Sequence, residues 1–298
     1  MIDLSMLNSL RAVDTHGSVV AAAEARGFTP SAISQQIKRL ERQAGVPLLE
    51  RVGRGVILTV HGRQLVDDGT RLVRDLERLE SELHRSIETV AGRIRLSAFS
   101  TAMRGLVAPV VRRLLGQHPD LELALEEHEP WDTIDLVASG RCEMGIVHSW
   151  GQVPIDVPEH VERISFASDI ADVIVHREHH LATRSVLTPA DLIDEDWIAT
   201  PENTICRQWL RRMHDGTGRL PRIAHESMEF ESHLALVGAG LGIALVPRLG
   251  RAALGDDLVA VAVTDPVPTR DVIALHRRTM AASPAIRAIL DELVWSSA

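Results

Sequence analysis

The sequence predicts a multidomain α/β protein, in which one long helix joins a small helical head to a larger α/β region. Three observations predict this organisation. Three helical segments, the last strongly amphipathic, fill the first 44 residues. Apolar side chains then recur at intervals of three and four residues up to about Val90, which is typical of a helix that pairs with another helix. From Arg93 onward, strand-like and helical segments alternate, which indicates an α/β fold.

The first two helical segments have well-marked ends. Apolar residues recur at helical spacing over 4–13, and the segment stops at His16-Gly17. Ser18 can cap a second helix over 19–26, whose alanines permit close packing against a neighbouring helix. A Gly-Phe turn follows at 27–28. Residues 18–28 therefore have the pattern of the first helix and the turn of a helix-turn-helix.

The third helix, over 29–44, has one apolar and one polar face. Thr29 fits as its N-cap, and Pro30 fits the first helical position, where a missing N–H costs nothing. The apolar face comprises Ile33, Ile37, Leu40 and Ala44. The opposite face and its flanks comprise Ser31, Ser34, Gln35, Lys38, Arg39 and Arg42. The pattern predicts a helix-turn-helix with a recognition-type second helix; a plain helical bundle with a polar surface is the alternative.

The polar face suits double-stranded DNA. Gln35 and Ser34 would face base edges, since the Gln amide matches adenine. The cations would mostly bind phosphates. A hairpin over 51–58 has glycines at its tip and predicts a basic wing; a solvated turn is the alternative. The expected DNA-binding residues are Pro30, Ser31, Ser34, Gln35, Lys38, Arg39, Arg42, Arg51 and Arg54.

The charge is divided unevenly along the chain. The formal net charge is −9, which by itself argues against a DNA-binding protein. However, residues 1–64 contain eight basic and five acidic side chains, whereas the remainder contains 24 basic and 36 acidic ones. This asymmetry predicts a phosphate-contacting head on an acidic body that stays off DNA.

Thr59 can cap the long helix, which we expect to run to about Val90. Its apolar seam comprises Leu65, Gly69, Leu72, Leu76, Leu79, Leu83, Ile87 and Val90. Densely charged residues of both signs lie between them, as on the outside of a helix pair. We expect a dimer held by Leu72, Leu76, Leu79 and Leu83. The alternative is that the seam packs against the chain's own body.

The region after Arg93 predicts a mostly parallel sheet with covering helices. Strands are expected over 93–98, 121–127, 145–147, 170–175, 223–226, 242–246 and 270–276, and the segment 188–199 is expected to form a short helix and a strand. Helices are expected over 102–116, 132–139, 204–214, 231–239 and 284–295, with a short one near 188.

The N-terminal sequence resembles the LysR-type transcriptional regulators. The resemblance rests on AAA at 21–23, TPSAISQQIKRLE at 29–41, GVPLLER at 45–51, Gly53-Arg54, and Thr59 with Gly62. Leu49 stands where the family usually has Phe, and Val19 where an aromatic is common; both are apolar exchanges. HPDLELALEE, SGRCEMGIV and LALVGAGLGIALVP extend the resemblance, more weakly, into the α/β region.

The resemblance implies a winged helix-turn-helix (1–58), a linker and dimerisation helix (59–90) and a two-lobed effector domain like periplasmic binding proteins. Lobe I would comprise 91–163 and 268–298, and lobe II 164–267. It implies dimers, and pairs of dimers forming a homotetramer, on an interrupted palindromic promoter site. The partners it implies are double-stranded DNA, an effector, a second copy of the chain and RNA polymerase, in the cytoplasm.

A ligand would sit beyond the carboxyl ends of the strands, where helix N-termini offer free N–H groups. Ser100 opens a helix after the first strand of this region. The family resemblance places Thr101, Pro130, Trp131, His148, Asn203, Thr204 and Phe230 in the cleft between the lobes. Hydroxyls and N–H dipoles there indicate a small polar effector with an anionic group, and the aromatic rings could stack on a flat part of it. For each residue alone, ordinary helix capping is an equal explanation.

We expect no enzymatic activity, cofactor or metal. GAGLG at 238–242 joins a helix to a strand, the reverse of the order in dinucleotide-binding folds. No Cys or carboxylate completes an obvious metal site with His176, His179 and His180, which are interpreted as a solvated turn. The start of the chain lacks the pattern of a signal peptide, and no apolar run is long enough to cross a membrane.

Two further functions remain as alternatives. One is a regulator of the same family that responds to redox or to a partner protein. In the redox case Cys142 would be the sensing thiol, although it is expected in the core, and the distant Cys206 is a poor resolving partner. A small-molecule-binding α/β protein with a vestigial helix-turn-helix is the other. The sequence sets neither the effector, the target genes, nor activation against repression.

Overall fold

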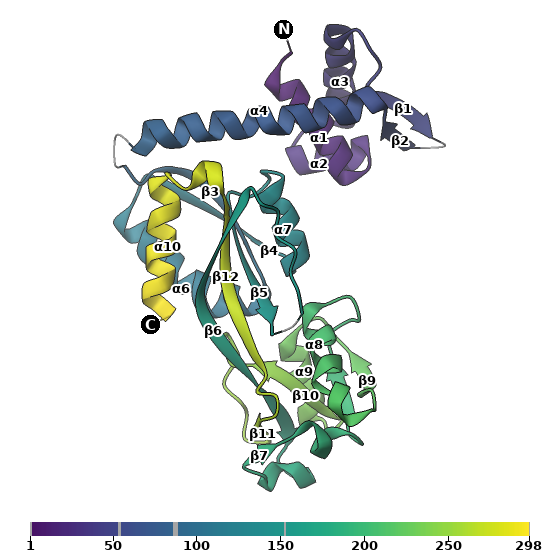
Figure 1. Ribbon diagram of the computed structural model, residues 1–298, viewed down its shortest axis with the longest axis vertical. Coiled ribbons are helices and arrows are strands. Elements are labelled where there is room, and N and C mark those ends of the chain that lie inside the picture. Colours follow the sequence, from purple (N-terminus) through teal and green to yellow (C-terminus); the bar gives the residue numbers. More distant parts are fainter. Residues whose placement is uncertain (1, 53–54, 86–88, 152, 298) are drawn as a thin grey trace. The chain divides into compact units, whose positions relative to one another are not determined.

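The computed structural model describes residues 2–52, 55–85, 89–151 and 153–297 (Figure 1). The chain forms two compact units, Met1–Leu79 and Glu80–Ala298. We refer to the α/β part of the second unit as the body. Arg54 of the predicted wing and Ile87 of the predicted seam lie outside the described residues.

The N-terminal unit contains the predicted helix-turn-helix. Its three helices are α1 (Leu4–His16), α2 (Val19–Arg26) and α3 (Pro30–Ala44). The wing hairpin consists of β1 (Leu49–Val52) and β2 (Gly55–Leu58), paired antiparallel. These bounds confirm the predicted helices and hairpin.

Capping groups set the helix ends where the sequence predicts them. Ser18 Oγ accepts the N–H of Ala21 at 3.1 Å, and Thr29 Oγ1 accepts the N–H of Ala32 at 3.2 Å. Gly27 and Gly45 end α2 and α3 with φ of 66° and 75°, a left-handed conformation that glycine adopts without strain.

Helix α4 (Val60–Arg85) begins at the wing and packs on the N-terminal unit. Val66 is buried in the core that α1 and α3 form, with Leu65 beside it. A Cβ atom at Gly69 would approach the Leu7 side chain to 2.5 Å, so the backbones are close because glycine has no side chain. The prediction that Leu65 and Gly69 belong to the pairing seam is therefore wrong.

The predicted end of α4 is also wrong. The helix ends at Arg85, and Thr89 and Val90 are not helical. Val90 instead packs against the body's hydrophobic core, just before strand β3. Burial of this side chain in the body outweighs the continuation of the helical repeat.

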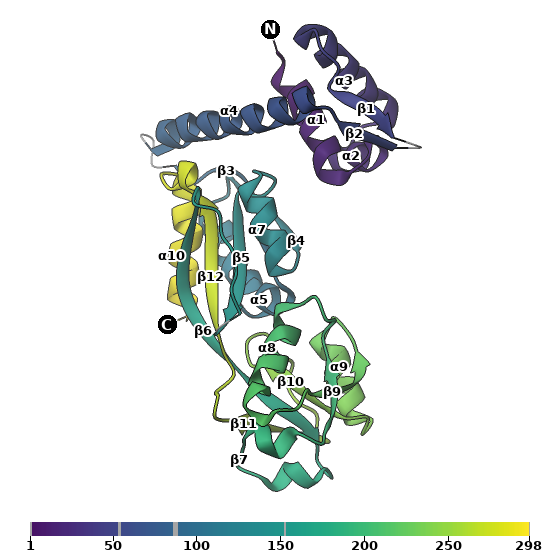
Figure 2. The ribbon, with the colours of Figure 1, turned by 45° about the vertical axis from the view of Figure 1, so that its right-hand side comes forward.

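The body is built on one long mixed sheet with the strand order β4-β3-β5-β12-β6-β10-β8-β9 (Figure 2). The first half contains β3 (Gly92–Ala98), β4 (Leu121–Glu127), β5 (Met144–Trp150) and β12 (Thr269–Arg277). The second half contains β7 (Val186–Leu187), β8 (Asp196–Ala199), β9 (Arg222–Glu226), β10 (Ile243–Pro247) and β11 (Leu258–Val263). Strand β6 (Val161–His176) runs through both.

Strand β6 links the halves by changing partners along its length. Its residues 161–170 pair with β12, whereas 171–176 pair with β10 and β11. These pairings are antiparallel, while β3–β4, β3–β5, β8–β9 and β8–β10 are parallel. The sheet is thus mixed, and the prediction of a mostly parallel sheet holds only within each half.

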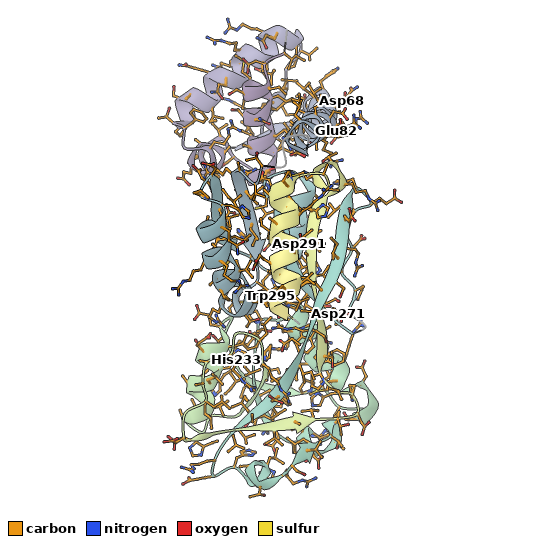
Figure 3. The ribbon with its side chains drawn as sticks, turned by 90° about the vertical axis from the view of Figure 1, so that its left-hand side faces the viewer. Asp68, Glu82, His233, Asp271, Asp291 and Trp295 are labelled. Atoms are coloured by element: carbon orange, nitrogen blue, oxygen red, sulfur yellow. The ribbon has the colours of Figure 1, made fainter. Side chains whose placement is uncertain are left out.

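Helices cover the two halves separately. The first half carries a continuous helical run, α5 (Ser100–Ala102), a π-helical turn (Met103–Val107) and α6 (Ala108–Gln117), together with α7 (Pro130–Ala138) and α10 (Pro284–Ser297). The second half carries α8 (Ile205–Met213) and α9 (Phe230–Gly238). Helix α10 contacts α6 and β6, and Figure 3 shows Asp291 and Trp295 along it.

Candidate functional site

The amphipathic helix α3 is arranged as the sequence predicts. Ile33 is fully buried, and Ile37 and Leu40 are buried with it. The solvent-facing residues are Pro30, Ser31, Gln35, Lys38, Arg39 and Arg42, with Ser34 half-buried beside them. One helix thus presents an amide, hydroxyls and three cations on one face, while its other face packs in the core.

Two polar side chains that sequence reasoning missed hold this helix in place. The Glu41 carboxylate accepts the N–H groups of Leu48 and Leu49 at 2.8 and 3.2 Å, which ties the end of α3 to the start of the wing. Gln36 accepts a hydrogen bond from the hydroxyl of Ser9 on α1. Their distant partners leave no local sequence signal, so only the folded chain reveals them.

The wing is anchored to the start of α4. Thr59 Oγ1 donates to the carbonyl of Pro47 at 2.8 Å and accepts the N–H of Gly62 at 3.0 Å, so it caps α4 as predicted. Arg51 lies exposed on β1. The exposed face of α3 and the wing strand that carries Arg51 therefore belong to one packed unit.

In the body, the side chain of Arg270 on β12 is a buried cation with several polar partners. Its Nε donates to Asp169 Oδ2 at 2.9 Å, and its Nη2 donates to Thr101 Oγ1 at 2.7 Å. Asp169 Oδ1 in turn accepts the N–H of Leu249 at 3.0 Å. The guanidinium also lies over the rings of Phe99 and Trp150. The Arg270 side chain therefore links three elements, β6, β12 and the short helix α5 that contains Thr101.

Aromatic rings extend this cluster. His148 is fully buried with its ring edge-on to Phe99, at 4.6 Å between centroids. Trp150 stacks on Trp209 of α8, at 5.8 Å and 18°. Burial, together with the positive charge of Arg270, holds the pKa of His148 well below its usual value. His148 is therefore neutral at pH 7.

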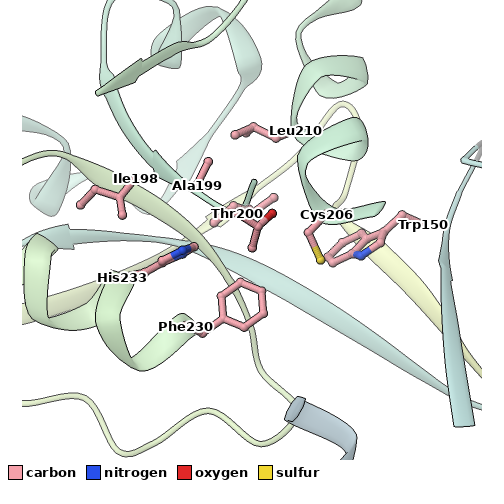
Figure 4. A pocket seen from close by; sticks show the side chains of 9 residues that line it. Trp150, Ile198, Ala199, Thr200, Cys206, Leu210, Phe230 and His233 are labelled. Atoms are coloured by element: carbon pink, nitrogen blue, oxygen red, sulfur yellow. The ribbon is translucent and has the colours of Figure 1, made fainter. Parts of the chain in front are cut away.

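A small pocket lies where the first half meets the second (Figure 4). The space in it that a water-sized sphere can occupy is about 20 Å³, little more than the room for one water molecule. Trp150 is its contribution from the first half. The second half contributes Ile198, Ala199, Thr200, Cys206, Leu210, Phe230, His233 and Leu245.

The polar groups of the pocket are few. The hydroxyls of Thr200 and Thr204 are 2.6 Å apart, and Thr204 also caps α8. His233 Nε2 lies 2.9 Å from the Ser227 carbonyl, which requires that this nitrogen carries the ring proton. Burial lowers the pKa of His233, so the ring is neutral and Nδ1 is an acceptor. Among the described residues Nδ1 has no hydrogen-bond partner.

The structure brings only some of the predicted effector-binding residues together. Phe230 lines the pocket and Thr204 supports its Thr200 wall, while Thr101 and His148 lie in the Arg270 cluster. The remaining four, Ser100, Pro130, Trp131 and Asn203, do not line it. Whether any of these residues contacts a ligand stays a prediction. Sequence reasoning missed Arg270, Cys206 and His233 as members of this region, and a cation at the head of the apolar run 272–275 was the available signal for Arg270.

A side-chain ion pair and a close backbone approach join the two halves of the body beside the pocket. Arg104 of the first half pairs with Glu231 on α9 at 2.9 Å and donates to the Gly250 carbonyl at 3.2 Å. A Cβ on Gly250 would lie 2.2 Å from the carbonyl oxygen of Thr101, so no larger residue fits there. The two halves are thus in direct contact in this conformation.

Two further sequence interpretations can be compared with the structure. The GAGLG segment lies at the end of α9 and before β10, as expected, with Gly240 in the left-handed conformation. His179 and His180, in contrast, do have a carboxylate partner, because the fold brings Glu195 to both. In the part of the chain that is described, no helix combines the length and apolar character needed to span a bilayer.

A helix-turn-helix with an exposed polar face on one unit, and a two-halved α/β body with a small pocket between its halves, are the architecture of DNA-binding transcriptional regulators with an effector domain. Within this class, the chain belongs to the LysR family. Residues 4–63 match the family described as bacterial regulatory helix-turn-helix protein, lysR family, and residues 88–295 match the LysR substrate binding domain. The protein is therefore a LysR-type DNA-binding transcriptional regulator.

Individual relatives are distant. The chain is 28% identical over 244 residues to the transcriptional regulator XapR of Escherichia coli, with 82% of each chain covered. It is 28% identical to the small neutral protease regulatory protein of Streptomyces coelicolor, over all of this chain and 88% of the relative.

Solved structures share the whole fold. A full-length OxyR variant of Pseudomonas aeruginosa matches with a TM-score of 0.74 at 18% identity, over 99% of this chain and 98% of that one. CbnR in complex with its target DNA matches with a TM-score of 0.60 at 20% identity, over 99% and 100%.

Proposed function

We propose that this regulator binds an interrupted palindromic promoter site as a dimer or a dimer of dimers, and that a small polar effector in the body controls its action. The observation that carries the DNA-binding part is the face of α3, where Gln35, Lys38 and Arg42 are exposed while Ile33 on the other face is fully buried. Action on the chromosome implies a cytoplasmic location, and contact with RNA polymerase would transmit the bound state to transcription.

The residues divide by role. Gln35 and Ser34 read base edges, because their side chains can both donate and accept hydrogen bonds. Cationic residues and the N-terminus of α3 bind phosphates and fix the register without reading sequence. This positioning set comprises Pro30, Ser31, Lys38, Arg39, Arg42, Arg51 and Arg54.

The proposed domain limits are those expected from the sequence. Residues 1–58 form the DNA-binding domain and 59–90 the linker and dimerisation helix. Lobe I comprises 91–163 and 268–298, and lobe II comprises 164–267. The change of partners along β6 near residue 170 and the contact between Arg104 and Glu231 support a two-lobed body in which closure can vary.

The effector pocket lies between the lobes. Its walls are largely apolar, Thr200 and His233 are among the polar residues that line it, and Thr204 is hydrogen-bonded to Thr200 behind the wall. The N-terminus of α8 adds positive dipole character beside Thr204, which suits an anionic group on the effector. An effector can shift closure only if it binds one arrangement of the lobes more tightly than the other.

A redox response is the weaker alternative. Burial raises the pKa of the Cys142 thiol to about 12 and that of Cys206 to about 11. Both thiols are therefore protonated at neutral pH and poorly nucleophilic, whereas redox-sensing cysteines are usually exposed thiolates. The effector hypothesis does not depend on either residue.

Binding measurements on DNA test the proposal. A site selected from a random pool of double-stranded DNA, and the same site scrambled, are titrated with wild-type protein and with Gln35→Ala. We expect Gln35→Ala to lose about 1–3 kcal/mol on the selected site and almost nothing on the scrambled one, because only base contacts discriminate. Gln43→Ala is the matched control, since it makes the same change at another exposed position of α3.

Lys38→Ala separates the phosphate role from the base-reading role. It should weaken binding to both DNAs equally and reduce the slope of log K against log salt by about 1. If Gln35→Ala loses equally on both DNAs, Gln35 does not read bases; if no sequence is enriched from the pool, the site-specific part of the proposal fails.

A further inference from the structure

A cluster of two imidazoles and one carboxylate lies at one corner of the second half of the body, apart from the effector pocket. His179 Nε2 is 3.2 Å from Glu195 Oε2, and His180 Nε2 is 3.2 Å from Glu195 Oε1. One atom from each of the three side chains lies within 4.8 Å of the others. Each carboxylate oxygen thus faces one imidazole nitrogen.

Two separate segments bring these side chains together. Strand β6 ends at His176, and His179 then caps a 3₁₀ turn, His180–Thr183. Glu195 directly precedes β8, in the loop after a second 3₁₀ turn, Pro189–Leu192. The Glu195 side chain is only 14% exposed and that of His179 23%, whereas that of His180 is 69% exposed. The cluster is therefore largely buried on one side and open to water on the other.

The spacing is compatible with a metal ion. Both N···O distances of 3.2 Å are at the long end of the range for N–H···O hydrogen bonds. Two ligand atoms bound at about 2.0–2.1 Å in tetrahedral geometry stand about 3.3 Å apart. Two imidazoles and one carboxylate are, moreover, a donor set that zinc and similar ions accept.

We propose that His179, His180 and Glu195 bind a divalent transition-metal ion of the Zn²⁺ type, with water completing its coordination on the open side. The ion replaces the protons that the imidazole nitrogens would otherwise share with the carboxylate. Both rings bind in their neutral form.

One contact of His179 changes when a metal binds. Its Nδ1 accepts the N–H of Leu181 at a long 3.3 Å. Metal binding through Nε2 places the ring proton on Nδ1 and releases that weak contact.

Metal binding has a structural consequence. The ion would clamp the corner after β6 to the loop before β8, two segments that are otherwise linked through β10 in the sheet. Glu195 stands at the start of β8, whereas Ile198 and Ala199 at its end line the effector pocket. The metal and the effector therefore act on opposite ends of the same short strand. The metal proposal does not depend on the identity of the effector.

Calorimetric titration of the full-length, untagged and chelator-stripped protein with ZnCl₂ tests the proposal. We expect one equivalent to bind with micromolar or tighter affinity and to raise the unfolding temperature. His180→Ala and Glu195→Gln should each weaken binding at least tenfold. His180 is largely exposed, so its variant should fold, which circular dichroism checks before titration.

His225→Ala is the matched control, because it removes an exposed histidine on β9 outside the cluster. It should bind Zn²⁺ like the wild type. The proposal is overturned if the wild type shows no saturable site, if His180→Ala and Glu195→Gln bind as the wild type does, or if His225→Ala loses binding to the same extent. In the first case the cluster is only a histidine–carboxylate ion pair.

Discussion

At the residue scale, Arg270 is the side chain with the largest consequence for the body. It is 1% exposed, and its guanidinium is shared between Asp169 and Thr101 while lying over two aromatic rings. A buried cation is tolerated only with such compensation, since each uncompensated charge costs several kcal/mol to desolvate. The Arg270–Asp169 pair therefore fixes how α5 packs against β6 and β12.

Arg270→Met should destabilise the body by about 3–5 kcal/mol, because it leaves the buried Asp169 carboxylate without its cation. Urea unfolding of the wild type and the variant measures this loss. The double variant with Asp169→Asn should recover part of it, since the unpaired charge is then gone. A single variant within about 1 kcal/mol of the wild type would contradict the role given to this pair.

The residues that sequence reasoning missed share one property. Arg270 is 101 residues from Asp169 and 169 from Thr101, and His180 is brought to Glu195 by a turn and a loop. No local periodicity encodes such pairs. In contrast, Gln35, Lys38 and Arg42 were predicted because one helix sets their relative positions.

Buried neutral histidines give the body a pH dependence with a defined sign. The pKa of His148 is lowered by burial and by Arg270, and burial also lowers those of His214 and His233. Below the ordinary histidine pKa of 6.5, the unfolded chain takes up protons that the folded chain does not. Stability is therefore retained above about pH 6.5 and is lost as the pH falls below it.

His148→Asn should reduce this acid sensitivity, because it removes one of the groups that bind a proton only on unfolding. We expect the unfolding temperature of the wild type to fall between about pH 7.5 and 5.5, and that of the variant to fall less steeply. Calorimetric scans at several pH values supply the slopes. Parallel slopes for the two proteins would exclude His148 as a contributor.

At the scale of elements, Gly62 near the start of α4 is a position where close packing requires glycine although helix propensity favours alanine. An alanine in a helix interior is favoured over glycine by about 1 kcal/mol. However, a Cβ on Gly62 would lie 2.2 Å from the backbone carbonyl oxygen of Leu48, which itself accepts the N–H of Thr59. The Leu48 carbonyl cannot move without disturbing the wing, so the clash outweighs the propensity.

Gly62→Ala should therefore destabilise the N-terminal unit, whereas Gly116→Ala in α6 should be neutral or stabilising, since its Cβ would meet no atom of the described residues within 4 Å. Hydrogen exchange read by mass spectrometry resolves the two units, so each variant is judged within its own unit. Equal or greater protection in Gly62→Ala would show that the wing accommodates the methyl group.

Elements with a strong period and clear caps were predicted, and elements stabilised mainly by tertiary pairing were not. Helices α1 to α3 were predicted correctly because the residues that cap each helix are its neighbours in the sequence. Strands β7 and β11 were missed, and β6 was predicted only from residue 170. Residues 161–169 are interrupted by polar side chains and were therefore not predicted as a strand. This part of β6 is stabilised by its pairing with β12, about 100 residues away in sequence.

At the scale of the whole molecule, the sequence predicts both units, because composition and charge differ between them. The predicted fold class is confirmed by the family matches over 4–63 and 88–295 and by the full-length structural neighbours. The assembly of several chains depends on the surfaces that are exposed in a single chain. We therefore argue it from exposed apolar side chains.

Helix α4 carries such a surface beyond the part that packs on α1. Leu72, Leu76 and Leu79 are 50%, 37% and 53% exposed, although leucine is normally buried. They continue the spacing of three and four residues along one face, which is the pattern of a helix that pairs with a second copy. Dimerisation through α4 would bury this stripe and place two recognition helices on one DNA site.

Leu76→Asp should therefore convert the protein to monomers, because the substitution places a charge in the apolar stripe at the centre of the pair. Arg78→Asp introduces the same acidic side chain at an exposed position off the seam and should remain dimeric. Light scattering gives the mass of each variant. The monomer should also lose affinity for a palindromic site while keeping its weak affinity for a half-site. A dimeric Leu76→Asp protein would place the interface on another surface, and equal losses in both variants would indicate a general effect of charge on α4.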